Sequence, residues 1–577
     1  MHITLLNNLK HPERIERLST QEVGMAEPKM QEHLENLRPD PSKGRDVKQK
    51  SPGELDPAVE KRTVQVRWGG LVLGVALSLL IYFILPDSMS HNSRLTAATA
   101  IVMAVWWMTE ALPIPATALL PLIIFPVLAQ PIQEEGKDPK PVTFDMLGAS
   151  YGSNTIFLFM GGFFIALAMQ RWNLHRRIAL AVLRVMPNKP GAMIAGFMIA
   201  TGFISMWVSN TATAVMMLPI GMSVLSLVNQ ITHNDDAHPK TGSIAYDAEG
   251  EPVKSAVDLI RTKFGSALML GIAYSASIGS LGTLIGTPPN ALLAGAMSDR
   301  LGFTIGFAQW MVVGVPVSIV MMAVAWFLLV KVLFKPEIDE IPGGRELIRS
   351  EMSKLGPMSQ GEIRVIIVFI ATALAWIIIP TVAQLTGGKA IISDAGIAMV
   401  SGVVLFMMPA GAERGVRLLD WKTAKDLPWD VLLLFGGGLA LSSMFTQSGL
   451  TDDIGGFAAH LNGVPPILIV AILAAAILFL TELTSNTATA ATFIPVSIGI
   501  ATGMGVDPLL FAAPVALAAT CAFMLPVATP PNAVAYGSGY VTIGEMIKGG
   551  FWLNVIGIGV VTLASSTLLV WVFGFAL

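Results

Sequence analysis

A polar pentapeptide that could bind a small ion occurs twice in this sequence, each time inside an apolar stretch. The residues Ser-Asn-Thr-Ala-Thr occupy 209–213 and 485–489, and a proline follows at the same distance in both copies. Hydroxyl groups and the asparagine amide can donate to an anion, and their oxygens can face a cation. Polar contacts between packed helices are the alternative for a single copy. The repetition, and the cost of polar groups in apolar surroundings, favour a binding site.

A second motif predicts that two helices break. The segment Thr-Pro-Pro-Asn occurs at 287–290 and again at 529–532. Proline lacks an N–H and clashes with the preceding helical turn, so a helix must unwind at this motif. We therefore expect broken helices over 266–298 and 508–541, whose freed carbonyl groups can ligate a desolvated sodium ion. A simple proline kink is the alternative, and the recurrence of the motif argues against it.

The Ser-Asn-Thr-Ala-Thr motifs need elements that end and restart within a membrane. The surrounding apolar stretches, 192–226 and 464–502, are predicted to be re-entrant hairpins with one motif at each tip. At such a tip the second helix begins at or just after the motif, and its first N–H groups have no intrahelical partner. The partial positive charge of this helix end can hold a carboxylate or a sulfate.

The composition is that of an all-α polytopic membrane protein. The chain has 577 residues, of which 53% are hydrophobic and 13% are charged, whereas soluble domains carry about 25% charged residues. Apolar runs of about 20 residues follow one another almost to the C-terminus, as membrane spans do. Eleven spans are predicted, at 68–86, 95–112, 114–130, 152–170, 266–298, 308–330, 365–384, 391–410, 430–447, 508–541 and 551–575.

The distribution of Lys and Arg predicts which way these spans face. With a cytoplasmic N-terminus and two hairpins that return to their own side, five of the 37 Lys and Arg lie outside, which leaves 32 on the cytoplasmic side. The five are Arg94, Lys137, Lys140, Arg300 and Lys389. If the two hairpin stretches crossed the membrane fully instead, part of this excess of Lys and Arg on the cytoplasmic side would be lost. The C-terminus is therefore expected outside, in a protein of the inner (plasma) membrane.

The paired motifs divide the chain into two related halves. The Ser-Asn-Thr-Ala-Thr copies lie 276 residues apart and the Thr-Pro-Pro-Asn copies 242 apart, and a polar insertion at 228–263 accounts for the difference. Each half holds five spans and one hairpin, and an odd number of crossings inverts the second half relative to the first. The expected organisation is a largely disordered polar tail at 1–67, a first span at 68–90, a first repeat at 91–335, a cytoplasmic linker at 336–364 and a second repeat at 365–577.

The segments around the motifs lack fixed positive charge. No Lys or Arg occurs in 190–226, 264–299, 464–502 or 508–541. A doubly charged anion there needs compensation, which co-bound cations supply because opposite charges attract strongly in a poorly solvated site. Na⁺ suits hydroxyl and carbonyl ligands, whereas a proton relay would need His, Asp or Glu. Glu482, the one acid in either hairpin, is interpreted as a structural carboxylate.

Other functional classes find little support in the sequence. The net charge of −3 argues against a nucleic-acid partner. No His lies in the hairpins or the broken spans, and no zinc-type or phosphate-binding pattern occurs, which argues against an enzyme. The one cysteine, Cys521, excludes an intrachain disulfide and is interpreted as a packing residue. Glu110, near the end of a span, is interpreted as structural.

The sequence resembles the divalent anion/sodium symporter family, the INDY-type di- and tricarboxylate transporters. The resemblance rests on the paired SNTAT motifs, on GTPPN and ATPPN, and on AMQRWNLHRRIAL at 168–180, and it covers about 95–577. It implies a homodimer in which each protomer has a scaffold domain and a transport domain that moves as an elevator. It also implies that the substrate binds at Ser209, Asn210, Thr211, Thr287, Pro288, Ser485, Asn486, Thr487, Thr529 and Pro530.

The same resemblance implies two sodium sites. The first would consist of Ser205, Ser209, Asn210 and Gly286, and the second of Thr481, Thr484, Asn486 and Ala528. Both sets keep a hydroxyl four residues before the motif serine, which favours symport over Na⁺-independent exchange. The expected activity is Na⁺-coupled uptake of a C4-dicarboxylate such as succinate, fumarate or malate. Citrate or sulfate symport, dicarboxylate exchange, an anion channel and a membrane-embedded enzyme remain the alternatives.

Overall fold

The structure is a computed structural model that describes residues 61–133, 138–232, 262–341, 343–386, 388, 390–461 and 463–575. Residues 1–60 of the predicted tail and 233–261 of the predicted insertion lie outside the described residues. The described part is helical, apart from two isolated β-bridges, Ile132 with Lys140 and Pro409 with Arg417. The expectation of an all-helical protein is therefore confirmed.

The first half of the chain contains both a helical hairpin and a broken helix. Its helices are α4 (Lys61–Ile84), α5 (His91–Thr109), α6 (Ile114–Thr117), α7 (Leu120–Leu128), α8 (Phe144–Gly148), η3 (Ala149–Gly152), α9 (Asn154–Arg171), α10 (Leu174–Val185), α11 (Pro190–Ser205), α12 (Asn210–Thr232), α14 (Lys263–Ser280), α15 (Pro288–Leu301), α16 (Phe307–Phe327) and η4 (Leu328–Leu333). Helix α4 begins before the predicted span start at residue 68, and the predicted span 114–130 is divided into α6 and α7.

The second half repeats this pattern. Its helices are α17 (Gly344–Lys354), α18 (Gln360–Leu385), α19 (Asp394–Met407), α20 (Trp421–Ala424), α21 (Trp429–Gln447), α22 (Leu450–Ala458), η5 (Ala459–Leu461), α23 (Pro466–Thr481), α24 (Asn486–Gly503), α25 (Pro508–Thr520), α26 (Pro530–Gly537), α27 (Ile543–Ser566) and α28 (Leu568–Phe573). Helix α17 and the start of α18 occupy the segment that the sequence predicts as a linker.

Several helices are suited to crossing a membrane. In the described residues, seven are long and apolar enough, at Lys61–Ile84, Phe144–Arg171, Asn210–Val228, Phe307–Leu333, Gln360–Ala383, Trp429–Gln447 and Ile543–Phe573. Shorter apolar helices run over Ile114–Leu128, Pro190–Ser205, Asp394–Met407, Pro466–Thr481 and Pro508–Thr520. A hydrophobic core about 30 Å thick needs roughly 20 helical residues, so the shorter segments reach only part of the way alone.

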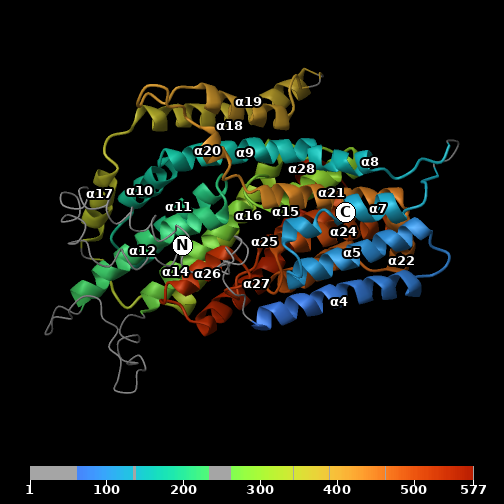
Figure 1. Ribbon diagram of the computed structural model, residues 1–577. Helices are drawn as coiled ribbons and strands as arrows, with labels where there is room; N and C mark the ends of the chain where they lie inside the picture. The colour runs from blue at the N-terminus through green and yellow to red at the C-terminus, as the bar shows by residue number, and fades with distance from the viewer. Residues whose placement is uncertain are drawn as a thin grey trace, which may run out of the picture. The chain divides into compact units, whose positions relative to one another are not determined.

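The broken helices form the buried centre of the fold. Every residue of α14 from Phe264 to Ser280 is buried, and so is every residue of α25 from Leu509 to Thr520. By contrast, α4 and α18 expose large apolar side chains such as Phe83 and Ile367. Figure 1 shows α18 and α19 side by side at the periphery. The apolar outer faces suit lipid, and the helices that carry the polar motifs are held inside.

Glycine lets the hairpin pack closely on the broken helix. A Cβ atom built on Gly279 of α14 would lie 2.2 Å from the carbonyl oxygen of Gly202 in α11 and 2.4 Å from its Cα. Real Cβ atoms do not approach backbone atoms this closely, so α11 and α14 can pack at this distance only because residue 279 has no side chain. This contact fixes the last turn of α11, and with it the motif that follows.

An ion pair anchors the end of α9. The guanidinium of Arg171 pairs with Asp420 and donates to Thr423 Oγ1 at 2.6 Å. The backbone N–H of Thr423, at 2.8 Å, and then Arg171 lower the pKa of Asp420 to about 2. The end of α9 is therefore joined to the short helix α20.

Candidate functional site

Both Ser-Asn-Thr-Ala-Thr motifs lie at hairpin tips. We call residues 206–209, between α11 and α12, the first tip, and residues 482–485, between α23 and α24, the second tip. Each second helix begins at the motif asparagine, and the carbonyl of the preceding serine accepts its first helical hydrogen bond. At the first tip, Ser209 Oγ also accepts from the Ala212 N–H at 3.3 Å. Each hairpin tip therefore carries the start of a helix.

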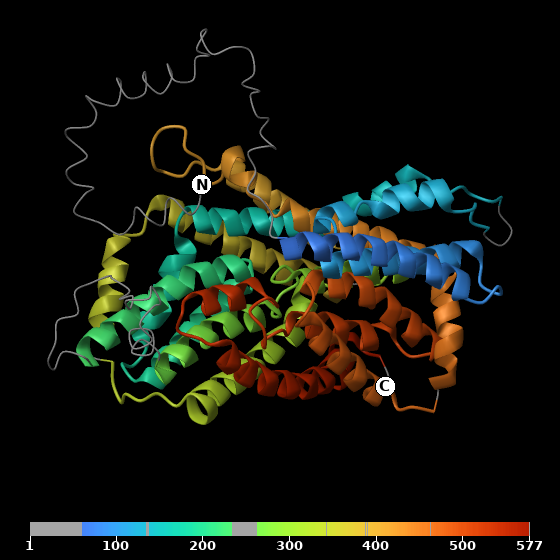
Figure 2. The same ribbon diagram turned by 60° about the horizontal axis from the view of Figure 1, so that its bottom comes forward.

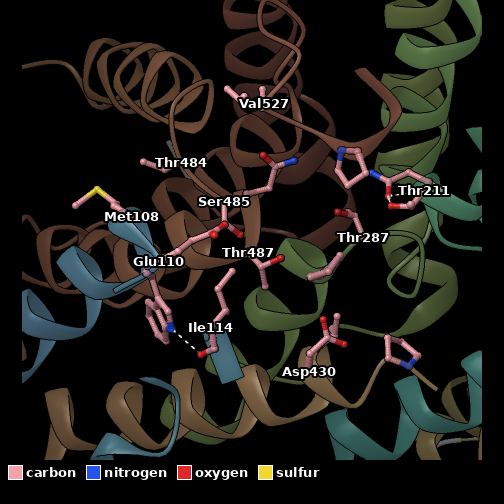
Figure 3. A pocket seen from close by; sticks show the side chains of 18 of the residues that line it. Met108, Glu110, Ile114, Thr211, Thr287, Asp430, Thr484, Ser485, Thr487 and Val527 are labelled. Carbon is pink, nitrogen blue, oxygen red and sulfur yellow. Dashed lines mark hydrogen bonds between the residues drawn. The ribbon is translucent and has the colours of Figure 1, made fainter. Parts of the chain in front are cut away.

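The two tips share one cavity of about 760 Å³ with the two helix breaks. The first break is residues 281–287, between α14 and α15, and the second break is residues 521–529, between α25 and α26. Predicted site residues that line this cavity are Ser209, Asn210, Thr211, Gly286, Thr287, Pro288, Thr484, Ser485, Asn486, Thr487, Ala528 and Pro530. Figure 3 shows Ser485 and Thr487 on one side, with Thr211 and Thr287 on the other.

Three predicted site residues are buried instead of lining the cavity. Thr529 is 2% exposed, and its hydroxyl accepts from the Asn532 N–H at 3.4 Å, at the start of α26. Ser205 and Thr481 are fully buried in the last turn before their tips. Thr529 therefore does not line the cavity, whereas Ser205 and Thr481 adjoin their tips.

The asparagines of the Thr-Pro-Pro-Asn motifs fix the two breaks in the same way. In the first break, Asn290 Nδ2 donates to the carbonyls of Leu281 at 3.3 Å and Thr283 at 2.8 Å. In the second, Asn532 Nδ2 donates to the carbonyls of Ala522 at 3.2 Å and Leu525 at 3.1 Å. Both asparagines are fully buried. These bonds satisfy carbonyls that the unwound backbone leaves without helical partners, a role that sequence reasoning did not assign.

The first tip and first break bring neutral oxygens together. Ser205 Oγ donates to the Ala276 carbonyl at 2.5 Å, and Thr283 Oγ1 donates to the Met206 carbonyl at 2.5 Å. Asn210 Oδ1 accepts from the Thr211 N–H at 2.8 Å. A Cβ on Gly286 would lie 2.3 Å from the Ser280 carbonyl oxygen, so this turn requires glycine. Hydroxyl, amide and carbonyl oxygens of this kind suit a sodium ion.

The second tip and second break have a matching arrangement. Thr481 Oγ1 lies 2.7 Å from Asn486 Oδ1 and 2.9 Å from the Ala519 carbonyl oxygen, as Ser205 lies against Ala276 in the first half. Thr484 Oγ1 donates to the Leu480 carbonyl at 2.9 Å. Within the described part of the chain, no three His, Cys, Asp or Glu side chains cluster as metal ligands would. The hydroxyl, amide and carbonyl oxygens named in these two regions are all neutral.

Glu482 has a structural role at the second tip. Its carboxylate accepts from three successive backbone N–H groups of the second break, those of Phe523 at 2.7 Å, Met524 at 2.9 Å and Leu525 at 3.1 Å. It also accepts from Asn554 Nδ2 at 2.7 Å and is only 3% exposed. The side chain thus ties the second tip to the second break, in agreement with its interpretation as a structural carboxylate.

Charged residues that the sequence did not assign to the site also line the cavity. They are Arg62 and Arg67 of α4, Glu110 after α5, and Asp430 in the first turn of α21. Glu110 adopts a left-handed backbone conformation, with φ of 48°, which is uncommon for a residue other than glycine. The sequence around it, WWMTEALPIP, places an acid before a proline-rich turn, and this is the one signal that could have singled it out.

Paired hairpin tips and broken helices around one polar cavity define the class of secondary transporters. The chain belongs to the family described as the sodium:sulfate symporter transmembrane region, whose model matches residues 65–575. It is therefore a membrane transporter and not an enzyme.

Curated relatives cover most of the chain. A protein named sodium-dependent dicarboxylate transporter SdcS, from Staphylococcus saprophyticus subsp. saprophyticus, is 42% identical over 496 residues, which are 86% of this chain and 90% of the relative. SdcS from Staphylococcus aureus strain USA300 is 40% identical over 489 residues, which are 84% of this chain and 88% of the relative. Among solved structures, the Alcanivorax borkumensis YdaH transporter is similar in fold, with a TM-score of 0.50 and 14% sequence identity. The match covers 84% of this chain and 99% of the YdaH chain.

Proposed function

We propose that this protein is a secondary active transporter that takes up C4-dicarboxylates, such as succinate, fumarate and malate, together with sodium ions. The observation that carries the proposal is the cavity between the two tips, which combines helix starts suited to carboxylates with oxygens suited to Na⁺. Two relatives with 40–42% identity bear the name sodium-dependent dicarboxylate transporter. The tips and breaks contain no Lys or Arg, so co-bound cations would compensate the charge of a dianion there.

The proposed roles follow the two tips. The substrate carboxylates bind at Ser209, Asn210, Thr211, Thr287, Pro288, Ser485, Asn486, Thr487 and Pro530, with Thr529 supporting the start of α26. One sodium ion binds at Ser205, Ser209, Asn210 and Gly286, and another at Thr481, Thr484, Asn486 and Ala528. At least two sodium ions therefore accompany each substrate.

The proposed architecture is an inverted repeat. Matching hydrogen bonds support it, because Asn290 and Asn532 bind their breaks alike, and Ser205 and Thr481 bind α14 and α25 alike. We assign eleven crossings, a cytoplasmic N-terminus, an outer C-terminus and a place in the inner membrane. Alternating access would proceed by an elevator movement of a transport domain along a scaffold domain, in a homodimer.

Sodium coupling has a direct test. Purified protein in proteoliposomes is given labelled succinate, with Na⁺ or choline outside. We expect uptake only with Na⁺, because the tips and breaks contain no Lys or Arg and bound cations would have to compensate a dianion there. Equal uptake with both cations would contradict symport and favour an exchanger. Competition by unlabelled citrate and sulfate decides between dicarboxylate transport and the two alternatives within the family.

The same assay tests the site assignment. Asn210→Ala and Asn486→Ala each remove the side-chain amide at the helix start that follows a tip. Both are expected to lower uptake at least about tenfold, since a lost hydrogen bond to a charged group costs roughly 1.5–3 kcal/mol. Thr492→Ala is the matched control, because its hydroxyl donates only within α24, to the Ala488 carbonyl. Full uptake by either asparagine variant would show that the substrate binds elsewhere.

A further inference from the structure

A glycine seam holds the first helix against the end of α5. A Cβ on Gly70 would lie 2.1 Å from Thr109 Oγ1, and a Cβ on Gly74 would lie 2.4 Å from Trp106 Nε1. The same indole donates to the Leu71 carbonyl at 3.3 Å. Two glycines four residues apart allow such a close helix approach. Figures 1 and 2 both show α4 beside α5.

The seam sets which residues of α4 reach the cavity. Those that line it are Arg62, Thr63, Val66 and Arg67, which share one helical face with the two glycines further along. Among the described residues that line the cavity, these arginines are the only cationic side chains. They are exposed, whereas the residues that adjoin the tips, such as Ser205 and Thr481, are buried. Positive charge is therefore confined to the open end of the cavity.

Arg67 has a weak partner there. Its guanidinium lies 4.0 Å from the carboxylate of Glu110, and the two side chains are 44% and 65% exposed. An exposed pair at this distance contributes little stability, so another carboxylate can compete for the arginine. Glu110 lies on the same side of the cavity as Ser485 and Thr487 (Figure 3). A dianion that leaves the tips on this side thus meets Arg67 next.

We propose that Arg62 and Arg67 form a receiving site for carboxylates at the α4 end of the cavity. An arginine fork matches a carboxylate in geometry and stays charged, and Glu110 occupies Arg67 when the substrate is absent. The proposal rests on the proposed dicarboxylate transport. The receiving site would supply fixed positive charge at the open end of the cavity, whereas the tips and breaks have none. Binding and release of the substrate on this side would then depend on that charge.

Charge replacement at one position tests this site. Arg67→Cys is expressed in bacterial membrane vesicles, and succinate uptake is measured in everted vesicles, where the α4 end faces the bath under the proposed orientation. We expect the KM for succinate to rise about fivefold there and to stay within about twofold in right-side-out vesicles, since local charge governs encounter rates. A methanethiosulfonate that adds an ammonium group should restore the KM, and one that adds a sulfonate should not.

Two controls keep the result interpretable. Arg414→Cys removes one positive charge from the same predicted side without lining the cavity, and should keep the wild-type KM. The native Cys521 is fully buried, so reagent-treated wild type should also be unchanged. Glu110→Gln frees Arg67 and should lower the KM about twofold, the opposite direction, as expected when a competing charge is removed.

The outcomes separate this proposal from the proposed function. A wild-type KM in Arg67→Cys vesicles of both orientations, or recovery with the sulfonate reagent as good as with the ammonium reagent, would overturn the receiving site. A rise in the KM that is confined to right-side-out vesicles would support the role of the Arg67 charge, but would place the α4 end of the cavity on the outer face of the membrane. Wild-type vesicles that ignore Na⁺ would reject symport, while the Arg67 comparison would still be measurable with the transported anion.

Discussion

At the scale of single residues, four motif asparagines have two different roles. Asn210 and Asn486 begin the helices after the tips and line the cavity. Asn290 and Asn532 are buried and use their side-chain NH₂ groups to hold the carbonyls of the breaks. The sequence predicts polar residues at all four positions. It does not predict the hydrogen-bond partners of Asn290 and Asn532, because an unwound segment follows no repeating sequence pattern that would show where its carbonyls point.

Glu482 supports a prediction at this scale. In Glu482→Gln, one carboxylate oxygen becomes an NH₂ group, which would face two backbone N–H donors, those of Phe523 and Met524 or those of Met524 and Leu525. Losing hydrogen bonds to a charged acceptor should cost about 2 kcal/mol of stability. We expect a lower melting temperature in detergent and a weaker apparent affinity for Na⁺, because the second break also carries Ala528.

The matched control for this prediction is Glu413→Gln, which removes one acidic charge from an exposed loop. It should leave both the melting temperature and the sodium dependence unchanged. A Glu482→Gln protein that melts and transports like wild type would mean that the carboxylate does not hold the second break. A variant that melts normally but loses sodium affinity would indicate that Glu482 acts mainly through its charge.

At the scale of elements, sequence reasoning placed the central helices best. The predicted hairpin 192–226 corresponds to α11 and α12, and the predicted broken helix 508–541 to α25 and α26. Proline and glycine mark these breaks in the sequence. No proline or glycine directly precedes the start of α4 at Lys61, and its first turns are polar like the predicted tail before them. The charged cavity residues Arg62 and Arg67 were missed for that reason.

The contact between α11 and α14 gives a prediction for these elements. Gly279→Ala adds a Cβ that would lie 2.2 Å from the Gly202 carbonyl oxygen, so the two helices must separate. Such overpacking is expected to cost about 1–3 kcal/mol. The displaced α11 would also shift Ser205 and the first tip. We therefore expect both a lower melting temperature and a reduced rate of sodium-dependent uptake.

An exposed helical glycine provides the control for this contact. Gly559 lies within α27, and a Cβ there would meet nothing within 4 Å. Gly559→Ala should leave uptake unchanged and raise stability by about 0.5–1 kcal/mol, since alanine favours a helix over glycine. If Gly279→Ala behaves like Gly559→Ala, the close packing of α11 on α14 is not what positions the first tip.

At the scale of the whole molecule, charge and symmetry support the same topology. The two halves repeat one set of elements, a hairpin followed by a broken helix, and use matching hydrogen bonds in each. Helix length alone does not decide the number of crossings, because only seven described helices are long enough by themselves. Broken helices such as α14 and α15 can cross as a pair, which length criteria applied to single helices miss.

The number of crossings gives the last prediction. Eleven crossings would place the two chain ends on opposite faces, and the excess of Lys and Arg predicts a cytoplasmic N-terminus. Alkaline phosphatase fused after Leu577 should be active, and a fluorescent protein fused there should be dark. The same reporters fused after residue 340, in the predicted linker, should give the reverse pattern. A fluorescent C-terminal fusion would mean an even number of crossings after the linker, and would contradict the assignment of eleven crossings.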